Sequence, residues 1–363
     1  MQTLNFHFKK MMGNAVAASA LFALALAAQA STIENGNFTP LITSGALPDS
    51  PSAHVDANTA SSAFSGVVSI NIVYPDASGK QLSYICSGAL VGKRTVVSAG
   101  HCVDTDGHGK VIDLSKPNNA VRVVFNNTGD KYTAIINASS VNMNPNYQGF
   151  GYCPPGINSF CVNDDISVIT LAQDAPASAR SYKIAANPLN GGTHITMAGY
   201  GTSGDGMNGY YVNPSFHVKR SGENYVDLFD GNDEQGWGGA NEVWYADFDG
   251  NGKDTFCTLF HACSPVLPNN RESGIGGGDS GGPSFVNMYG ELMLAANNTF
   301  SGTFSGQTPG TFGTYFGGIL LSSYKGYLGA AAGEGITFVP EPGSLALLGL
   351  GAVLLLRSRR RVA

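Results

Sequence analysis

The sequence has little positive charge away from its two ends. Two of its 20 basic residues lie within residues 1–30 and four lie beyond Pro340, which leaves 14 basic and 25 acidic residues in between. The net charge of this central part is therefore about −11. Such a charge disfavours nucleic acid and anionic lipid as partners and suits a soluble exported protein.

Long apolar runs are also scarce, and the two that matter lie at the ends of the chain. Lys9 and Lys10 precede a run rich in alanine and leucine from Ala15 to Ala28, and Ala28-Gln29-Ala30 fits the small-residue rule for cleavage. Residues 1–30 therefore predict a signal peptide for the Sec export machinery. A membrane anchor is the alternative, and the shortness of the run disfavours it.

At the other end, Val339-Pro340-Glu341-Pro342-Gly343 precedes an apolar run from Ser344 to Leu356 and an arginine cluster from Arg357 to Arg361. This tail, residues 339–363, resembles the PEP-CTERM sorting signal of Gram-negative bacteria, which implies processing by an exosortase. As a helix the run spans about 20 Å, short of the roughly 30 Å hydrocarbon core. We expect a transient inner-membrane anchor, with its arginines in the cytoplasm, and then release to the cell surface or extracellular matrix. An ordinary short anchor is the alternative.

Between these ends the chain lacks long helical periods. It has 48 glycines and short strand-like runs bounded by Gly, Pro, Asn and Asp, which predict an all-β fold with many tight turns. These runs include residues 66–74, 121–125, 166–171, 291–294 and 311–316. Residues 31–60 are rich in Ser, Ala, Pro, Asn and Thr, so we expect an exposed leader or propeptide-like segment there.

One hydroxyl side chain lies in a segment that is otherwise nearly all glycine, Gly276-Gly277-Gly278-Asp279-Ser280-Gly281-Gly282-Pro283. Glycine permits close backbone approach, so N–H groups beside Ser280 can converge where a carbonyl oxygen becomes an oxyanion. Taken alone, the segment is as typical of a turn. Upstream, Ser98-Ala99-Gly100-His101-Cys102 contributes a histidine and Asn163-Asp164-Asp165-Ile166 contributes aspartates before an apolar run. The order His, Asp, Ser is that of a serine-protease triad.

These three motifs resemble those of the trypsin/chymotrypsin family, and the resemblance covers roughly residues 64 to 328. It implies two antiparallel six-stranded β-barrels with the active site between them. The N-terminal barrel would span residues 61–178 and carry the histidine and the aspartate. The C-terminal barrel would span residues 179–332 and carry the serine.

The cysteines fit this interpretation. Six cysteines in an exported chain indicate three disulfide bonds, and no two have the two-residue spacing typical of a zinc site. The family's disulfide beside the histidine implies a bond between Cys86 and Cys102. The simplest local closures for the others are Cys153–Cys161 and Cys257–Cys263.

The resemblance also implies roles for the site residues. Ser280 would be the nucleophile and His101 the general base that takes its proton. Asp165 would orient the imidazole. Asp164 competes for that role, but the family's aspartate stands directly before an isoleucine-like residue, as Asp165 does. The backbone N–H groups of Gly278 and Ser280 would form the oxyanion hole.

The specificity pocket departs from the family pattern. Gly274 stands six residues before Ser280, where a member that cuts after Lys or Arg has an acidic residue. The next residues, Ile275 and Gly276, lack the cysteine that usually staples the pocket wall. An uncharged floor predicts cleavage after small or apolar residues, unless Glu272 reaches the pocket.

Activation departs from the pattern as well. The family pairs a freed amino terminus with the aspartate before the serine, here Asp279. The matching region near Ala53-His54-Val55 has no basic residue before it and no paired glycines. Either cleavage near Ser52 to His54 supplies an amine, or an internal cation, Lys219 or Arg220, pairs with Asp279.

We expect no required cofactor and no metal at the catalytic centre. Asp247, Asp249 and Asn251, with Gly252 at the sixth position, match the first half of an EF-hand loop. The twelfth position is Thr258, so the bidentate glutamate is missing, and the flanks are not helical. The pattern fits either a weak Ca²⁺ site or a polar turn.

Together the motifs predict a secreted trypsin-like serine endopeptidase that acts on protein or peptide substrates. The alternative is a catalytically silent trypsin-fold protein that serves as a surface or matrix interaction module. An esterase of another fold is disfavoured, because no strand–serine–helix elbow surrounds Ser280.

Overall fold

The computed structural model describes residues 42–129, 132–153, 161–333 and 335–340. The predicted signal peptide and the apolar part of the predicted sorting tail lie outside these residues. Within the described ranges, no helix is long and apolar enough to cross a membrane.

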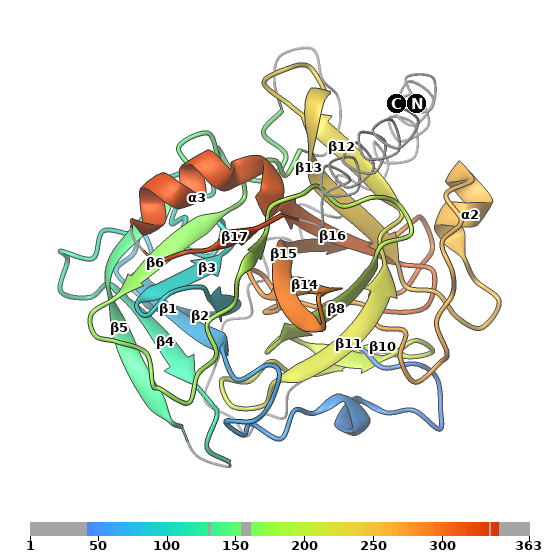
Figure 1. Ribbon diagram of the computed structural model, residues 1–363, viewed down its shortest axis with the longest axis horizontal. Coiled ribbons are helices and arrows are strands. Elements are labelled where there is room, and N and C mark those ends of the chain that lie inside the picture. Colours follow the sequence, from blue (N-terminus) through green and yellow to red (C-terminus); the bar gives the residue numbers. More distant parts are fainter. Residues whose placement is uncertain (1–41, 130–131, 154–160, 334, 341–363) are drawn as a thin grey trace, which may run out of the picture.

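The N-terminal half is a closed antiparallel barrel of six strands in the order β1-β2-β3-β6-β5-β4 (Figure 1). Val68, Ile70 and Ile72 alternate along β1 and are fully buried, as the two-residue period of a strand requires when one face lines a core. The strands are β1 (Val67–Pro75), β2 (Gln81–Leu90), β3 (Thr95–Ser98), β4 (Ala120–Phe125), β5 (Ala134–Met143) and β6 (Ser167–Leu171).

The C-terminal half contains a nine-stranded sheet whose main path runs β11-β8-β14-β15-β16-β13-β12. The short strands β7 and β17 join it through parallel pairs. The strands of this sheet are β7 (Ile184–Ala185), β8 (His194–Gly199), β11 (Arg220–Tyr225), β12 (Leu228–Asn232), β13 (Gly238–Asp247), β14 (Pro283–Met288), β15 (Glu291–Gly302), β16 (Tyr315–Leu320) and β17 (Phe338–Val339). The predicted all-β, two-barrel fold is confirmed, and the second half has strands beyond the six expected.

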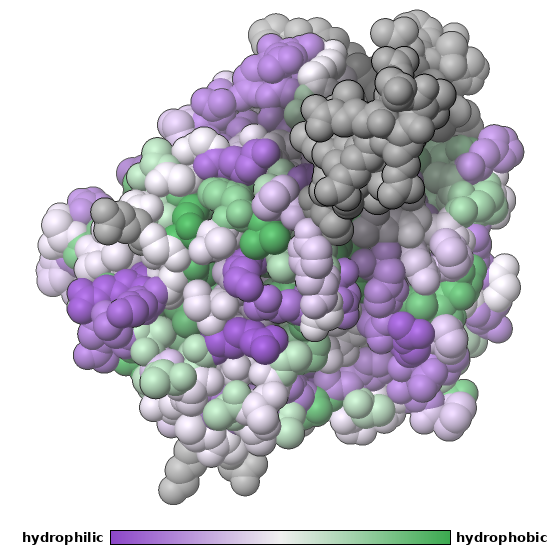
Figure 2. All heavy atoms as spheres, viewed as in Figure 1, coloured by the Kyte–Doolittle hydropathy of each residue, from purple (hydrophilic) through white to green (hydrophobic). Residues whose placement is uncertain are grey.

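The remaining elements are short. A hairpin of β9 (Ser203–Asp205) and β10 (Gly209–Val212) stands apart from both sheets. The helices are η1 (Pro51–His54), α2 (Thr255–Phe260), η2 (Leu321–Tyr324) and α3 (Lys325–Ala332). On the face drawn in Figure 2, hydrophilic side chains gather in several separate groups, with apolar side chains scattered between them.

The segment before the first barrel corrects one expectation. The sequence predicts an exposed stretch over residues 31–60, yet Ile42, Thr43 and Ser44 are fully buried. Thr43 explains why polar composition misleads here, because its hydroxyl exchanges hydrogen bonds of 2.9 and 2.7 Å with the backbone of Gly274. Small polar side chains whose hydrogen bonds are satisfied in this way can be buried at low cost.

The six cysteines form three disulfide bonds with the expected pairing, Cys86–Cys102, Cys153–Cys161 and Cys257–Cys263. The first bond ties β2 to the turn that carries His101. It thereby connects the barrel wall to the candidate site.

Candidate active site

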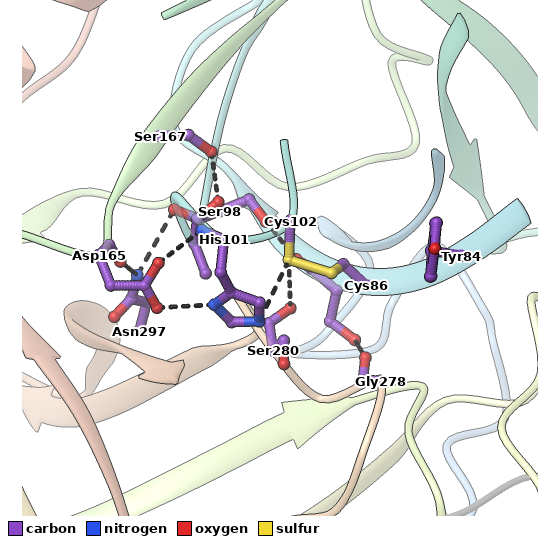
Figure 3. The surroundings of a disulfide bond; sticks show 12 residues. Tyr84, Cys86, Ser98, His101, Cys102, Asp165, Ser167, Gly278, Ser280 and Asn297 are labelled. Carbon is purple, nitrogen blue, oxygen red and sulfur yellow. Dashed lines mark hydrogen bonds and ion pairs between the residues drawn. A yellow bond between two sulfur atoms is a disulfide. The ribbon is translucent and has the colours of Figure 1, made fainter. Parts of the chain in front are cut away.

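His101 lies in a turn just after β3, next to the Cys86–Cys102 disulfide (Figure 3). Its Nδ1 lies 2.8 Å from Asp165 Oδ2, and its backbone N–H donates to Asp165 Oδ1 at 2.6 Å. The Asp165 side chain is fully buried, whereas the His101 side chain is 19 % exposed. The carboxylate thus holds both the ring and the backbone of His101, and leaves Nε2 on the side of Ser280.

Asp164 faces away from this contact. Its φ of +64° lies in the left-handed region, so the chain turns sharply between the two aspartates. Its carboxylate accepts a hydrogen bond of 3.0 Å from Asn144. Burial raises the pKa of Asp164 to about 8, and repulsion from Glu234 adds to the rise. The structure therefore brings Asp165, and not Asp164, against His101.

The Ser280 loop depends on glycine at two positions with positive φ. Gly278 has φ of +101° and Gly281 has φ of +77°, a region that other residues rarely adopt. A Cβ at Gly281 would also collide with Ser98 Oγ. These two glycines let the loop lie directly against the turn that follows β3.

Ser87 of β2 fastens the same loop to the N-terminal barrel. Its N–H donates to the Ser280 carbonyl and its hydroxyl donates to the Gly278 carbonyl, both at 2.8 Å. Ser280 and His101 are consequently neighbours, although they come from different halves of the chain (Figure 3). Among the described residues, no hydrogen bond joins Ser280 Oγ to His101.

The backbone N–H groups expected to form the oxyanion hole are those of Gly278 and Ser280. The N–H of Asp279 between them donates to the Gly276 carbonyl at 3.0 Å, and that of Gly281 donates to the Asn298 carbonyl at 2.7 Å. Neither Gly278 nor Ser280 donates its N–H to another described residue. Both N–H groups expected in the oxyanion hole thus have no partner among the described residues.

Asp279, the residue directly before Ser280, is fully buried. Its oxygens accept the N–H groups of Gly201 at 2.8 Å and Gly276 at 2.9 Å. Its carboxylate fills the space that a side chain at Gly199 would need. Burial raises the pKa of Asp279 to about 7, and Arg220, paired with Gly199 between β11 and β8, opposes the rise.

Lys219, one of the two cations expected to pair with Asp279, binds other groups. Its Nζ lies 3.3 Å from Asp56 Oδ1 and donates to the Phe64 carbonyl at 2.6 Å. Arg220 is also bound to the backbone of the early segment, through its Nε and the Pro51 carbonyl. Within the described residues, neither cation forms an ion pair with Asp279, and of the two only Arg220 acts to lower its pKa.

The predicted pocket residues are packed against the early segment and the hairpin. A Cβ at Gly274 would lie 3.2 Å from Thr43 Oγ1 and 3.6 Å from Phe248 Cβ. Ile275 is buried, and its carbonyl accepts the hydroxyl of Tyr210 at 2.5 Å. None of the side chains of Thr43, Phe248, Ile275 and Tyr210 carries a charge.

Glu272, the acidic residue nearest to the predicted pocket in sequence, is buried. Its carboxylate accepts the Asn224 side chain at 2.6 Å and the N–H of Leu267 at 3.1 Å. It belongs to an acidic cluster with Asp247 and Asp249, so it does not supply a free charge to the floor at Gly274.

Two residues that the motifs do not reveal complete the surroundings of His101. Asn297 of β15 donates to the Asp165 carbonyl at 3.1 Å and accepts the N–H of Ile319 at 3.0 Å, which ties the aspartate to the second half (Figure 3). The ring of Phe150 lies 4.7 Å from that of His101. Neither lies in a sequence motif, because each is brought to the site only by the fold.

A two-barrel fold with a histidine–aspartate pair and a serine loop at the junction defines the class of chymotrypsin-like proteins. Residues 56–219 match the family model for trypsin, and residues 338–361 match the PEP-CTERM protein-sorting motif. A comparison with curated proteins finds no match. Residues 56–219 are therefore similar to trypsin, which supports a hydrolase of the serine-protease-like type, and the sorting motif indicates export and sorting in Gram-negative bacteria.

Proposed function

We propose that this protein is a serine endopeptidase that cleaves peptide bonds through an acyl-enzyme on Ser280. The observation that carries the proposal is the buried Asp165 bound to His101 beside a serine loop in which two N–H groups have no described partner. The trypsin match includes His101 and Asp165 and ends before Ser280, so the serine rests on its position in the structure.

The chemistry follows from this placement. His101 Nε2 takes the Ser280 proton as Oγ attacks the scissile carbonyl, and later gives the proton to the leaving amine. Asp165 keeps the imidazole in the required tautomer and stabilises its cation. The N–H groups of Gly278 and Ser280 bind the oxyanion, which is the charge that develops in the transition state. Water then hydrolyses the acyl-enzyme with His101 as the base.

A fluorophosphonate probe tests the proposal, because it labels an activated serine and spares an inert one. The exported protein should react with the probe at Ser280, as located by peptide mass spectrometry. The Ser280→Ala protein is the matched control and should remain unlabelled. If the folded native protein also failed to react, the silent interaction module would become the better explanation.

The uncharged surroundings of Gly274 predict the substrate preference. Chromogenic peptides with Ala, Val, Leu or Phe before the scissile bond should be cleaved with a higher kcat/KM than matched peptides with Arg or Lys. The physical reason is that Glu272, the acidic residue nearest to Gly274 in sequence, is bound by Asn224 and Leu267 and so offers the pocket floor no free countercharge. A clear preference for Arg would contradict this assignment of the pocket.

For the tail we propose a transient inner-membrane stage before release to the surface or matrix. Changing Pro340, Glu341 and Pro342 together to alanine should trap uncleaved protein in the inner-membrane fraction of a host that has the exosortase. The physical reason is that proline fixes φ and disfavours a helix at the residue before it, so we expect the processing enzyme to depend on the two prolines. Fractionation and mass spectrometry of the carboxyl terminus measure the effect, and release at the native rate with the native terminus would contradict it.

A further inference from the structure

An acidic cluster lies in the C-terminal half, where β13 ends and the chain leads into α2. Asp247, Asp249 and Asp254 each place a carboxylate oxygen within 4.8 Å of the other two. Two more acids border them: the N–H of Asp249 donates to Glu272 at 3.4 Å, and that of Asp247 donates to Asp227 at 3.3 Å. Five carboxylates from three segments thus meet in one place.

Two of these carboxylates have an oxygen that the described protein leaves without a partner. Asp247 is 1 % exposed and Asp249 is 3 % exposed, and the Oδ1 atom of each is buried and makes no hydrogen bond. The other oxygen of Asp247 accepts the N–H groups of Thr255 and Phe256 at 2.6 and 3.0 Å, so the side chain is held in place. A buried carboxylate oxygen without a partner is costly, which points to a ligand beyond the chain itself.

The cluster also lacks a basic partner. None of the ion pairs within the described ranges includes any of its five acids, and the nearby Lys253 donates to the Phe312 carbonyl at 3.2 Å. Carboxylates this close together repel one another when they are ionised. A cation between the carboxylates would remove this repulsion.

We propose that Asp247, Asp249 and Asp254 bind a calcium ion between the end of β13 and the start of α2. Donors that are all oxygen favour a hard cation over zinc. Oxygens spread over as much as 4.8 Å can be bridged by Ca²⁺, whose ligands lie at about 2.4 Å, more readily than by the smaller Mg²⁺.

The site differs from the loop expected from the sequence. Asn251, the third ligand of the EF-hand-like pattern, is exposed and its amide lies 3.5 Å from Met207 Sδ. Its φ of +50° turns the chain away, and Asp254 takes its place in the cluster. Asp254 also caps α2 through the N–H of Cys257 at 2.8 Å, so the ion would join this helix to the sheet.

The position of the site gives the ion a consequence for the pocket. Phe248, between the first two ligands, packs against Gly274 and lies with its ring 4.7 Å from that of Phe312. Glu272 stands two residues before Gly274 in the same segment. Calcium should therefore stabilise the C-terminal half and the wall behind the predicted pocket, whether or not Ser280 is a nucleophile.

Calorimetric titration of the exported Ser280→Ala protein after treatment with EGTA tests the proposal, with Ca²⁺ and Mg²⁺ as separate titrants. We expect one Ca²⁺ per chain with a Kd on the order of 10⁻⁶ to 10⁻³ M, at least about tenfold weaker Mg²⁺ binding, and a higher Tm with Ca²⁺. Asp249→Asn keeps the side-chain shape but removes a charged ligand, so it should weaken Ca²⁺ binding at least about tenfold. Asp174→Asn, at a 59 % exposed side chain, should bind as the parent does.

The absence of binding heat and of a Tm shift at millimolar Ca²⁺ would overturn the site, as would unchanged affinity in the folded Asp249→Asn protein. If that variant does not fold, the site can be tested in the protein that keeps Asp249. The measurement is Tb³⁺ luminescence excited through Trp244 of β13. Emission that Ca²⁺ displaces supports the site, and absence of emission refutes it. None of these measurements depends on peptide hydrolysis, so they separate this site from the proposed function.

Discussion

Ser280→Ala is expected to lower peptide hydrolysis by a factor of about 10⁴ to 10⁶ while leaving folding and export intact. The loop is held by carbonyl contacts to Ser87 and by the glycine conformations at Gly278 and Gly281, none of which involves the Ser280 hydroxyl. The measurements are kcat/KM on a peptide substrate and the Tm of the purified protein.

His101→Ala is the companion variant and should show a loss of similar size, because Ser280 without its base is an ordinary alcohol. Groups that act as one unit are strongly non-additive, so the double variant should be little worse than either single one. Retention of more than about a hundredth of native turnover in Ser280→Ala, with unchanged Tm, would remove Ser280 from the role of nucleophile.

Asp165→Asn should reduce turnover at neutral pH by about 10⁴, because an amide at this position favours the wrong tautomer of the imidazole. Asp165 is the carboxylate that holds both Nδ1 and the backbone N–H of His101. The measurement is kcat for the purified variant, with circular dichroism to show that the fold is retained.

Asp164→Asn is the matched control, since it makes the same chemical change one residue away. Asp164 accepts from Asn144 and makes no described contact with His101, so its replacement should cost far less turnover. If Asp164→Asn lost far more turnover than Asp165→Asn, the orienting role would belong to Asp164, and the contact between Asp165 and His101 would be structural only.

Much of the fold could be predicted from the sequence because its signals are local. Alternating apolar residues in β1 predict a strand with one buried face, and the glycines at 278 and 281 are the residues that tolerate the positive φ of the serine loop. The three disulfides followed from one family pair and two short closures. Apart from the Cys86–Cys102 pair, which the family resemblance implied, these inferences need only residues that are close together in the chain.

The order of His101, Asp165 and Ser280 along the chain and the sorting motif could likewise be predicted from the sequence alone. Only the tertiary structure decided which side chains meet. Asp165 contacts His101, whereas Asp164, which has a positive φ, contacts Asn144. In the acidic cluster Asp254 takes the place of Asn251, which also has a positive φ. Ile42 to Ser44 are buried by partners some 160 to 230 residues away. Such contacts depend on how strands that are distant in the sequence pair with one another, and a local pattern of residues does not predict that pairing.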